Sequence, residues 1–314
     1  MGFDLKGLAD VVAVENRVAR VVVAGLRGSS PREIGAAMLV WAGGQSGTIG
    51  GGALEFHAAL AARAMLDSDN ARLSHHALGP DLGQCCGGAV SLLTEVYDLA
   101  SVNNLSTEVI SRPTGAGIAM PLSVKRVLAT ARGCGTQPEP QLLDGWMIEP
   151  VHHPKRNLWI WGAGHVGRAL VDVLSPLPDL AVTWVDTASE RFPSEVPEGV
   201  TVVPVDKPGD LVRHTPVDSE HLVLTYSHEL DLELCHQLLR HGFSRAGLIG
   251  SATKWARFRS RLKALGHGID LIDRIECPIG DPSLGKHPQM IAIGVASALL
   301  RPTMEMTTQK GLRA

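Results

Sequence analysis

The sequence predicts an α/β protein of two domains, in which a mixed α+β domain precedes a doubly wound parallel sheet. Its 314 residues are enough for two domains of ordinary size. The first half holds short β-branched runs separated by glycine turns, whereas from Leu158 onward short apolar runs alternate with helical segments. Such alternation is typical of a parallel sheet with helices on both faces.

We place the first domain at residues 1–153 and the second at 157–301. Between them, the run from His152 to Arg156 has the composition of a linker. Within the first domain, residues 101–153 are the most weakly defined part. Residues 302–314 lack an apolar face and are expected to form a tail.

The first domain is expected to contain several short strands and few helices. One helix is predicted over Ala53 to Asp67, where apolar residues recur at spacings of three and four. Strands are predicted where short apolar runs end at glycine-rich turns. They are Val18 to Leu26, Ala36 to Trp41, Ser46 to Ile49, Ala71 to Leu78, Ala89 to Tyr97 and Gly145 to Ile148.

The second domain is predicted to contain six strands separated mostly by helices. The strands are Leu158 to Trp161, Ala181 to Val185, Val200 to Val205, His221 to Thr225, Ala246 to Ile249 and Asp273 to Cys277. A helix is expected over His165 to Leu174, and a closing helix over Ile291 to Leu300 is entered through Pro288.

Composition excludes several classes of protein. The net charge is -3 without a basic cluster and aromatic residues are 4%, which argues against nucleic acid as a partner. No apolar run is long enough to cross a bilayer and no signal peptide is visible, so we expect no membrane association. Five cysteines without framework spacing indicate unpaired thiols and a cytoplasmic protein.

A dinucleotide-binding fingerprint opens the second domain. Gly162, Gly164 and Gly167 match G-x-G-x-x-G between a predicted strand and a predicted helix, and Asp186 ends the next strand. In this Rossmann-like context, the glycines permit a tight turn, close approach of a pyrophosphate and close packing of helix on strand. Asp186 could accept a hydrogen bond from a ribose 2′-hydroxyl, which predicts NAD or a related nucleotide in preference to NADP.

Other polar residues follow later strands, where such folds bind ligands. His228 is a candidate for proton transfer, and Lys254 follows the next strand. Equally, Glu229 and Asp231 can be first-turn acids that serve a helix dipole. For Cys277 the simpler interpretation is a buried thiol at the end of a strand.

Two glycine-rich turns in the first domain are candidate anion sites. Gly50, Gly51 and Gly52 precede a predicted helix, where exposed amides and the helix N-terminus favour negative charge. Glu55 in the first turn could instead satisfy that dipole itself. In the earlier turn, Ser29, Ser30 and Arg32 offer hydroxyls and a guanidinium suited to phosphate, although ordinary turns explain both segments equally well.

The run from Gly83 to Gly88 is the most informative in the chain. Two adjacent thiols, Cys85 and Cys86, lie between glycines, which let the backbone approach a ligand closely. A thiol in such a loop can act as a soft metal ligand or a reactive thiolate. The alternative is a pair of small buried side chains.

Together these three loops resemble the signature loops of the XdhC/CoxI family. The second domain resembles that family's Rossmann domain at Gly162 to Gly167, at Gly247 to Lys254 and from Cys277 to Gln289. The resemblance implies a chaperone without turnover of its own, so no catalytic residue is assigned. Such proteins bind the molybdenum cofactor (molybdopterin), hold it while a cysteine desulfurase supplies a sulfido ligand, and deliver it to apo xanthine dehydrogenase.

The resemblance also implies which residues would hold the cofactor. Cys86, and secondarily Cys85, are the candidate molybdenum contacts. The candidate binding residues of the first domain are Ser29, Ser30, Arg32, Gly50, Gly51, Gly52, Glu55, Gln84 and Gly87. We further expect a homo-oligomer. The alternative function is an NAD-dependent oxidoreductase that uses the Rossmann-like domain, with His228 or Lys254 as acid or base.

Overall fold

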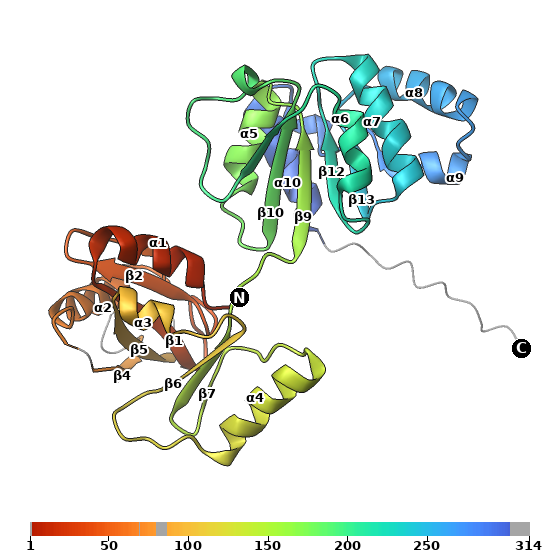
Figure 1. Cartoon of the computed structure of the whole chain (residues 1–314). Coiled ribbons are helices and arrows are strands. Elements are labelled where there is room, and N and C mark those ends of the chain that lie inside the picture. Colours follow the sequence, from red (N-terminus) through yellow and green to blue (C-terminus); the bar gives the residue numbers. More distant parts are fainter. Residues whose placement is uncertain (1, 69, 80–86, 302–314) are drawn as a thin grey trace, which may run out of the picture. The chain divides into compact units, whose positions relative to one another are not determined.

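The structure is a computed structural model that describes residues 2–68, 70–79 and 87–301. The chain divides into two compact units, Met1–His153 and Pro154–Ala314, and each is described by itself (Figure 1). The predicted α/β class, with a mixed first part and a parallel sheet in the second, is confirmed.

The first unit is built on a five-stranded antiparallel sheet of order β3-β2-β1-β5-β4. Its strands are β1 (Val18–Arg27), β2 (Ala37–Trp41), β3 (Gly44–Gly47), β4 (Arg72–Ala77) and β5 (Ala89–Tyr97). Along the central strand, Ala19, Val21 and Val23 face one apolar cluster that includes α2 (Gly52–Ala64). Val22 and Ala24 face a second cluster, which includes Met147. Because both faces of β1 are covered, apolar residues occupy successive positions from Val21 to Ala24, and Arg20 just before them is buried.

A second, three-stranded antiparallel sheet of order β6-β8-β7 supplies Met147 to the second of these apolar clusters. It consists of β6 (Val109–Pro113), β7 (Gln141–Leu143) and β8 (Trp146–Pro150). Helix α4 (Leu122–Cys134) buries Val124 against Trp146 and Ile148 of β8. The weakly defined segment of the sequence is therefore an ordered layer, in which β8 extends the strand predicted from Gly145.

Three helices of the first unit were not predicted from the sequence. They are α1 (Leu5–Glu15), α3 (Leu99–Asn103) and α4. The N-cap of α1 is Asp4, whose side chain accepts a hydrogen bond from the Gly7 amide, but only Leu8 and Val12 are fully buried. Such a narrow apolar stripe gives a weak periodic signal, so tertiary packing rather than sequence pattern decides that these helices form.

The second unit is a six-stranded, all-parallel sheet of order β11-β10-β9-β12-β13-β14. The strands are β9 (Arg156–Trp161), β10 (Leu180–Asp186), β11 (Thr201–Pro204), β12 (Glu220–Val223), β13 (Arg245–Leu248) and β14 (Ile275–Glu276). After β11 at one edge, the chain returns to place β12 beside β9. The carboxyl ends of β9 and β12 therefore flank the switch point where doubly wound sheets bind ligands.

Helices cover both faces of this sheet (Figure 1). On one face, α5 (His165–Leu174) and α10 (Pro288–Leu300) share an apolar cluster. On the other, α7 (His228–His241) and α8 (Ala252–Ala264) share a second cluster. Two short helices, α6 (Pro208–Leu211) and α9 (Ile269–Ile272), complete the unit with three 3-10 turns at Ser189–Arg191, Val212–His214 and Pro282–Leu284.

Candidate functional site

The glycine-rich turns of the first unit meet where the central strands β1 and β5 leave the sheet. Arg27 pairs with Ala89, so the turn after β1 and the residues before β5 leave the sheet side by side. A Cβ atom added at Gly88 would lie 2.2 Å from the Ser29 carbonyl oxygen, which only glycine avoids. A Cβ atom at Gly50 would come within 2.5 Å of Pro31 Cγ. Segments 28–32, 47–52 and 87–88, separated in sequence, thus form one contiguous surface.

The thiol run itself lies outside the described residues. Gln84, Cys85 and Cys86 fall in the segment 80–86, and the structure describes the chain again from Gly87, which is exposed. Gly88, the next residue, is buried against the turn after β1. Among the residues that are described, no three His, Cys, Asp or Glu side chains gather as metal ligands. The assignment of Cys86 and Cys85 as metal contacts therefore stays a prediction.

Glu55 already occupies part of the predicted anion loop. Its carboxylate accepts hydrogen bonds from the Thr48 hydroxyl at 2.5 Å and from the Ile49 and Gly51 amides at 3.1 Å each. Partial burial acts to raise the pKa of Glu55, but these hydrogen bonds outweigh it and the pKa is lowered. Of the two interpretations of Glu55, the structure favours the one in which it satisfies its own loop.

The start of helix α2 keeps further donors. Gly50, Gly51 and Gly52 all have positive φ angles, of 126°, 75° and 66°. Within the described chain, no side chain caps α2 at Gly51, and a Cβ atom at Gly51 would meet nothing within 4 Å. Amides at the first turn of a helix have no partner within the helix. The loop thus combines an internal carboxylate with open space before an uncapped helix.

Arg32 and its neighbouring hydroxyls are held by short-range contacts. The Ser30 hydroxyl donates to the Arg32 carbonyl oxygen at 2.9 Å. The Arg32 guanidinium lies 3.4 Å from the Glu33 carboxylate, and its side chain is 27% exposed. Arg32 is therefore half-buried, not a fully exposed turn residue, while Ser29 is exposed. A guanidinium in this position faces both solvent and its own loop.

The glycine roles predicted for the second unit agree with its geometry. A Cβ atom at Gly162 would lie 2.4 Å from the Leu224 carbonyl oxygen, and one at Gly167 would lie 2.0 Å from the Gly162 carbonyl oxygen. Both positions are closed to any side chain because strand and helix pack closely there. At Gly164, an added Cβ atom meets nothing within 4 Å. This is the position where the fingerprint leaves room for a pyrophosphate.

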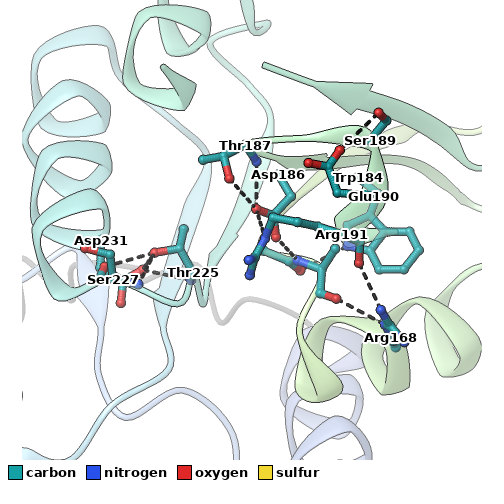
Figure 2. Close-up of polar contacts among 12 residues, drawn as sticks. Arg168, Trp184, Asp186, Thr187, Ser189, Glu190, Arg191, Thr225, Ser227 and Asp231 are labelled. Atoms are coloured by element: carbon teal, nitrogen blue, oxygen red, sulfur yellow. Dashed lines mark hydrogen bonds and ion pairs between the residues drawn. The ribbon is translucent and has the colours of Figure 1, made fainter. Parts of the chain in front are cut away.

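Asp186 has an additional structural role that the sequence did not reveal. Its carboxylate is 3% exposed and accepts hydrogen bonds from the Ala163 amide at 2.5 Å and the Thr187 amide at 2.6 Å. It also forms an ion pair with the Arg191 guanidinium at 2.5 Å (Figure 2). Both oxygens are thus engaged within the protein. Its role as a ribose acceptor stays a prediction.

Arg191 links the loops on either side of the glycine turn. Its guanidinium lies 4.1 Å from the centre of the Tyr226 ring, which follows β12. Arg168 of α5 donates to the Arg191 carbonyl oxygen at 2.9 Å and to the Ala163 carbonyl oxygen at 3.2 Å (Figure 2). Arg191 was not a candidate from the sequence, because its partners lie on three separate segments and no local motif marks it.

A buried ion pair lies at the carboxyl edge of β12 and β13. The Lys254 ammonium donates to Asp231 at 2.6 Å and to the Ile249 carbonyl oxygen at 3.0 Å. Asp231 also accepts from the Thr225 hydroxyl at 2.7 Å and is 1% exposed. Asp231 is thus in the first turn of α7, as expected, but its side chain turns inward to Lys254.

The other polar candidate residues differ in how far their side chains are exposed to solvent. His228 and Glu229 are exposed at the start of α7, where the Ser227 hydroxyl caps the helix. Cys277 follows β14 and is half-buried, and burial raises the pKa of its thiol to about 11. A thiol with that pKa stays protonated near neutral pH and is a poor nucleophile.

Two cavities lie at the carboxyl ends of the parallel strands. One of 510 Å³ is lined by Gly250, Ser251 and Pro278, among others, beyond β13 and β14. The second, of 430 Å³, is lined by residues that follow β10 and β11, including Thr187, Glu190 and Asp206. They lie beyond strands on either side of β9 and its glycine turn.

Two family models match the chain. One, described as the XdhC Rossmann domain, matches residues 158–299. The other, described as the XdhC and CoxI family, matches residues 11–76, and the two together take in well over half of the sequence. This chain belongs to the XdhC/CoxI family. The resemblance drawn from its glycine-rich loops is thereby confirmed.

Relatives of this family member include one curated protein and one crystal structure. It is 28% identical over 152 residues to the uncharacterized protein YqeB of Escherichia coli (strain K12). That alignment takes in 48% of this chain and only 28% of YqeB. A crystal structure described as a xanthine dehydrogenase from Bacillus halodurans matches with a TM-score of 0.67 and 21% identity over 95% of both chains. At this identity the match shows a shared fold.

Nothing in the described part of this XdhC/CoxI chain has the character of a membrane span. No helix there is both long enough and apolar enough to cross a bilayer. The longest described helix is α7, which has 14 residues and carries acidic residues in its first turn.

Proposed function

We propose that this chain is an accessory factor for the maturation of xanthine dehydrogenase, which binds the molybdenum cofactor in its first unit and delivers it to the apoenzyme. The observation that carries the proposal is the convergence of segments 28–32, 47–52 and 87–88 at one end of the central strands β1 and β5. The thiol pair Cys85–Cys86 precedes Gly87 directly in sequence. A phosphate-bearing cargo with a thiolate-accepting metal suits this set of donors.

Each loop has a distinct part in this proposal. The amides at the uncapped start of α2, together with the Gly51 amide that now donates to Glu55, would hold the phosphate of the cargo. Arg32, with the exposed Ser29 hydroxyl, would add a charge-assisted contact. Cys86, and secondarily Cys85, with Gln84 beside them, would contact or protect the molybdenum. Glu55 competes for the same amides, so a bound phosphate must share the loop with this carboxylate or displace it.

The chain would act with partners and without turnover of its own. A cysteine desulfurase would supply the terminal sulfido ligand while the cofactor is held here, and xanthine dehydrogenase would receive it. These proposals rest on the family to which the chain belongs and on the chemistry of the loop residues. We further propose a cytoplasmic homo-oligomer, in keeping with the unpaired thiols of the sequence.

Molybdenum loading tests the thiol assignment. Cys85→Ala, Cys86→Ala and the double variant are loaded with cofactor, and molybdenum per chain is measured. We expect the largest loss in the double variant and a larger loss for Cys86→Ala than for Cys85→Ala. Cys134→Ala, which removes an exposed thiol elsewhere, is the matched control. Unchanged loading in all three variants would refute the assignment.

Arg32→Ala tests the phosphate contact. The variant should weaken pterin binding by about 1.5–3 kcal/mol if Arg32 makes a charged hydrogen bond to the phosphate. Because Arg32 is half-buried, its unfolding is measured alongside by urea denaturation. Normal cofactor affinity in a folded Arg32→Ala protein would remove Arg32 from the site.

Reconstitution tests delivery. Cofactor-loaded chain, a cysteine desulfurase with cysteine, and apo xanthine dehydrogenase are mixed and xanthine oxidation is measured. We expect activation beyond that by free cofactor at equal concentration, with this chain absent from the purified active enzyme. Equal activation by free cofactor would refute the chaperone role, and recovery of the chain as a fixed subunit would refute transient action.

A second candidate function is an NAD-dependent oxidoreductase, which the Lys254–Asp231 pair at the carboxyl edge favours. Lys254 donates to the carbonyl oxygen of Ile249, which lines the 510 Å³ cavity, and could hold or transfer a proton, whereas exposed His228 has no comparable setting. Calorimetry with NAD and NADP tests the nucleotide site first. Substrate-dependent NADH formation would establish the oxidoreductase. If millimolar nucleotide produces no heat of binding, the glycine fingerprint serves the fold alone.

A further inference from the structure

A cavity of 310 Å³ in the first unit has no part in the proposed cofactor site. It lies where β5 ends at Tyr97 and β6 ends at Pro113, whereas the glycine-rich loops meet at the opposite end of β5, at Ala89. Its walls are partly apolar, from Val96, Leu105 and Pro113. Three of its lining residues are buried polar side chains: Glu95, Tyr97 and Arg112.

Arg112 leaves one guanidinium nitrogen without an acceptor. Its Nε donates to the Glu95 carboxylate at 2.8 and 2.9 Å, and its Nη2 donates to the Glu149 carboxylate at 2.5 Å. Nη1 is buried and has no hydrogen-bond partner among the described residues. Arg112 is only 8% exposed. A buried donor of a charged group that lacks an acceptor costs free energy. Such a donor therefore indicates a place where a bound molecule can supply the acceptor.

The Tyr97 hydroxyl is a second buried donor that lacks an acceptor among the described residues. Tyr97 is 5% exposed, and its oxygen has no hydrogen-bond partner in the described part of the chain. Its ring is held edge-on against Phe3, with centroids 6.1 Å apart. Burial raises the pKa of this phenol well above its usual value, so the hydroxyl keeps its proton and can donate. One cavity therefore adjoins two buried residues that each carry an unpaired donor.

The buried charges around the cavity already balance. Arg20 donates to both oxygens of Glu149 at 2.7 and 3.0 Å, which completes a network of two guanidinium groups and two carboxylates with Arg112 and Glu95. Phe3 packs against both guanidinium groups, at 4.1 and 5.1 Å. An anion added here would be a buried charge without a free countercharge, which is costly. A neutral acceptor would satisfy the donors without that cost.

We propose that this cavity, lined by Tyr97 and Arg112, binds a small uncharged molecule that presents a carbonyl or amide oxygen beside an apolar body. The oxygen accepts from Arg112 Nη1 and from the Tyr97 hydroxyl, and the body packs against Val96 and Leu105. A cavity of this volume accommodates a single-ring amide. The site is separate from the cofactor loops, so its test does not depend on the proposed function.

Benzamide is the probe, and the two tyrosines of the chain make the test local. The full chain is labelled with ¹³C at the tyrosine rings, and the signals are assigned with Tyr97→Phe and Tyr226→Phe. We expect saturable movement of the Tyr97 signal with benzamide and none of the Tyr226 signal. Benzoate, its anionic analogue, and toluene, which lacks the acceptor, should each bind at least about tenfold more weakly.

Variants then test the donors. By ligand-observed NMR, Tyr97→Phe should weaken benzamide binding about fivefold, as expected for loss of one hydrogen bond. Tyr226→Phe should leave binding unchanged. Arg112→Lys keeps the charge but removes Nη1, and should weaken binding further if circular dichroism shows it folded. If Arg112→Lys does not fold, the Tyr97→Phe variant and the two labelled tyrosine signals still test the proposal.

Three outcomes would overturn the proposal. The first is a Tyr97 signal that does not saturate with benzamide, which would leave the donors to solvent alone. The second is benzoate binding as tightly as benzamide, which would make this an anion site. The third is Tyr97→Phe binding benzamide as tightly as the parent chain.

Discussion

Two glycine-rich turns that open helices, one in each unit, look alike in sequence and differ in structure. In both, a carboxylate accepts from loop amides: Glu55 from Ile49 and Gly51, and Asp186 from Ala163. Glu55 lies on the helix that the loop opens and is partly exposed, whereas Asp186 comes from the adjacent strand and is 3% exposed. The first carboxylate therefore ties the loop to its own helix, whereas the second ties the loop to the neighbouring strand.

The difference teaches that a glycine pattern does not by itself identify a ligand site. What matters is where the competing carboxylate comes from. Around Gly162, the Trp184 indole also donates to the Gly162 carbonyl oxygen at 3.0 Å, and Arg168 binds the Ala163 carbonyl oxygen (Figure 2). The second loop is thus held from both sides, while the loop before α2 is held by Glu55 of the helix that it opens.

Removal of Asp186 should have the largest effect. Asp186→Asn places an amide group against the Ala163 and Thr187 amides and removes the partner of Arg191. We expect the free energy of unfolding of the second unit to fall by about 3 kcal/mol, because buried donors lose their acceptor. Glu55→Gln in the first unit should cost only about 0.5–1 kcal/mol. Urea denaturation with tryptophan fluorescence compares the two, and equal losses would contradict the comparison.

Alanine at the glycines should separate packing from open space. Gly162→Ala combines a φ of 129° with a Cβ atom 2.4 Å from the Leu224 carbonyl oxygen, and should destabilise by about 3 kcal/mol. Gly51→Ala has a φ of 75° but open space, and should cost about 1 kcal/mol. Gly164→Ala is the control, with neither feature, and should stay within about 0.5 kcal/mol of the parent. Thermal and urea unfolding measure all three.

Acid should weaken the second unit before the first. Burial, with a smaller repulsion from His241, lowers the pKa of His221 to about 3. The unfolded chain takes up this proton near pH 6.5 and the folded unit does not, so stability is lost as pH falls below about 6.5, by at most about 1.4 kcal/mol per pH unit.

The first unit depends instead on Glu149. Burial acts to raise its pKa, but Arg20 and Arg112 outweigh burial and lower it, so its contribution is lost only below the usual range of a carboxyl. Urea unfolding at pH 7, 6 and 5 tests the order, with His221→Gln expected to flatten the pH dependence and exposed His228→Gln to leave it unchanged. Earlier loss of the first unit would refute this account.

The smallest expected effect concerns anion affinity. Glu55→Gln removes the negative charge but keeps an acceptor oxygen for the loop amides, so binding of inorganic pyrophosphate should tighten about fivefold. Glu229→Gln, an exposed first-turn acid of the second unit, is the matched control and should change nothing. Isothermal titration calorimetry measures both. Weaker binding in Glu55→Gln would mean that the carboxylate organises the anion site.

Strong local patterns predicted much of the fold. The strands β1, β5, β9 and β10 and helix α5 lie within a residue or two of their predicted positions. Helices α1 and α4 escaped prediction because each buries only one or two side chains fully. In the candidate sites, the glycine roles followed from the fingerprint, whereas Arg191 and the inward turn of Asp231 had no local signal.

The sequence by itself determined the family, the parallel sheet of the second unit and the glycines that its turns require. These follow from local periodicity and from backbone conformations that only glycine adopts without strain. Only the tertiary structure decided which carboxylates hold the loops, which charges pair in the interior, and that Arg112 and Tyr97 share one cavity. Arg112 and Glu149, for example, are 37 residues apart. Such partners meet through packing of distant segments, and a hydrogen bond between them leaves no periodic trace in the chain.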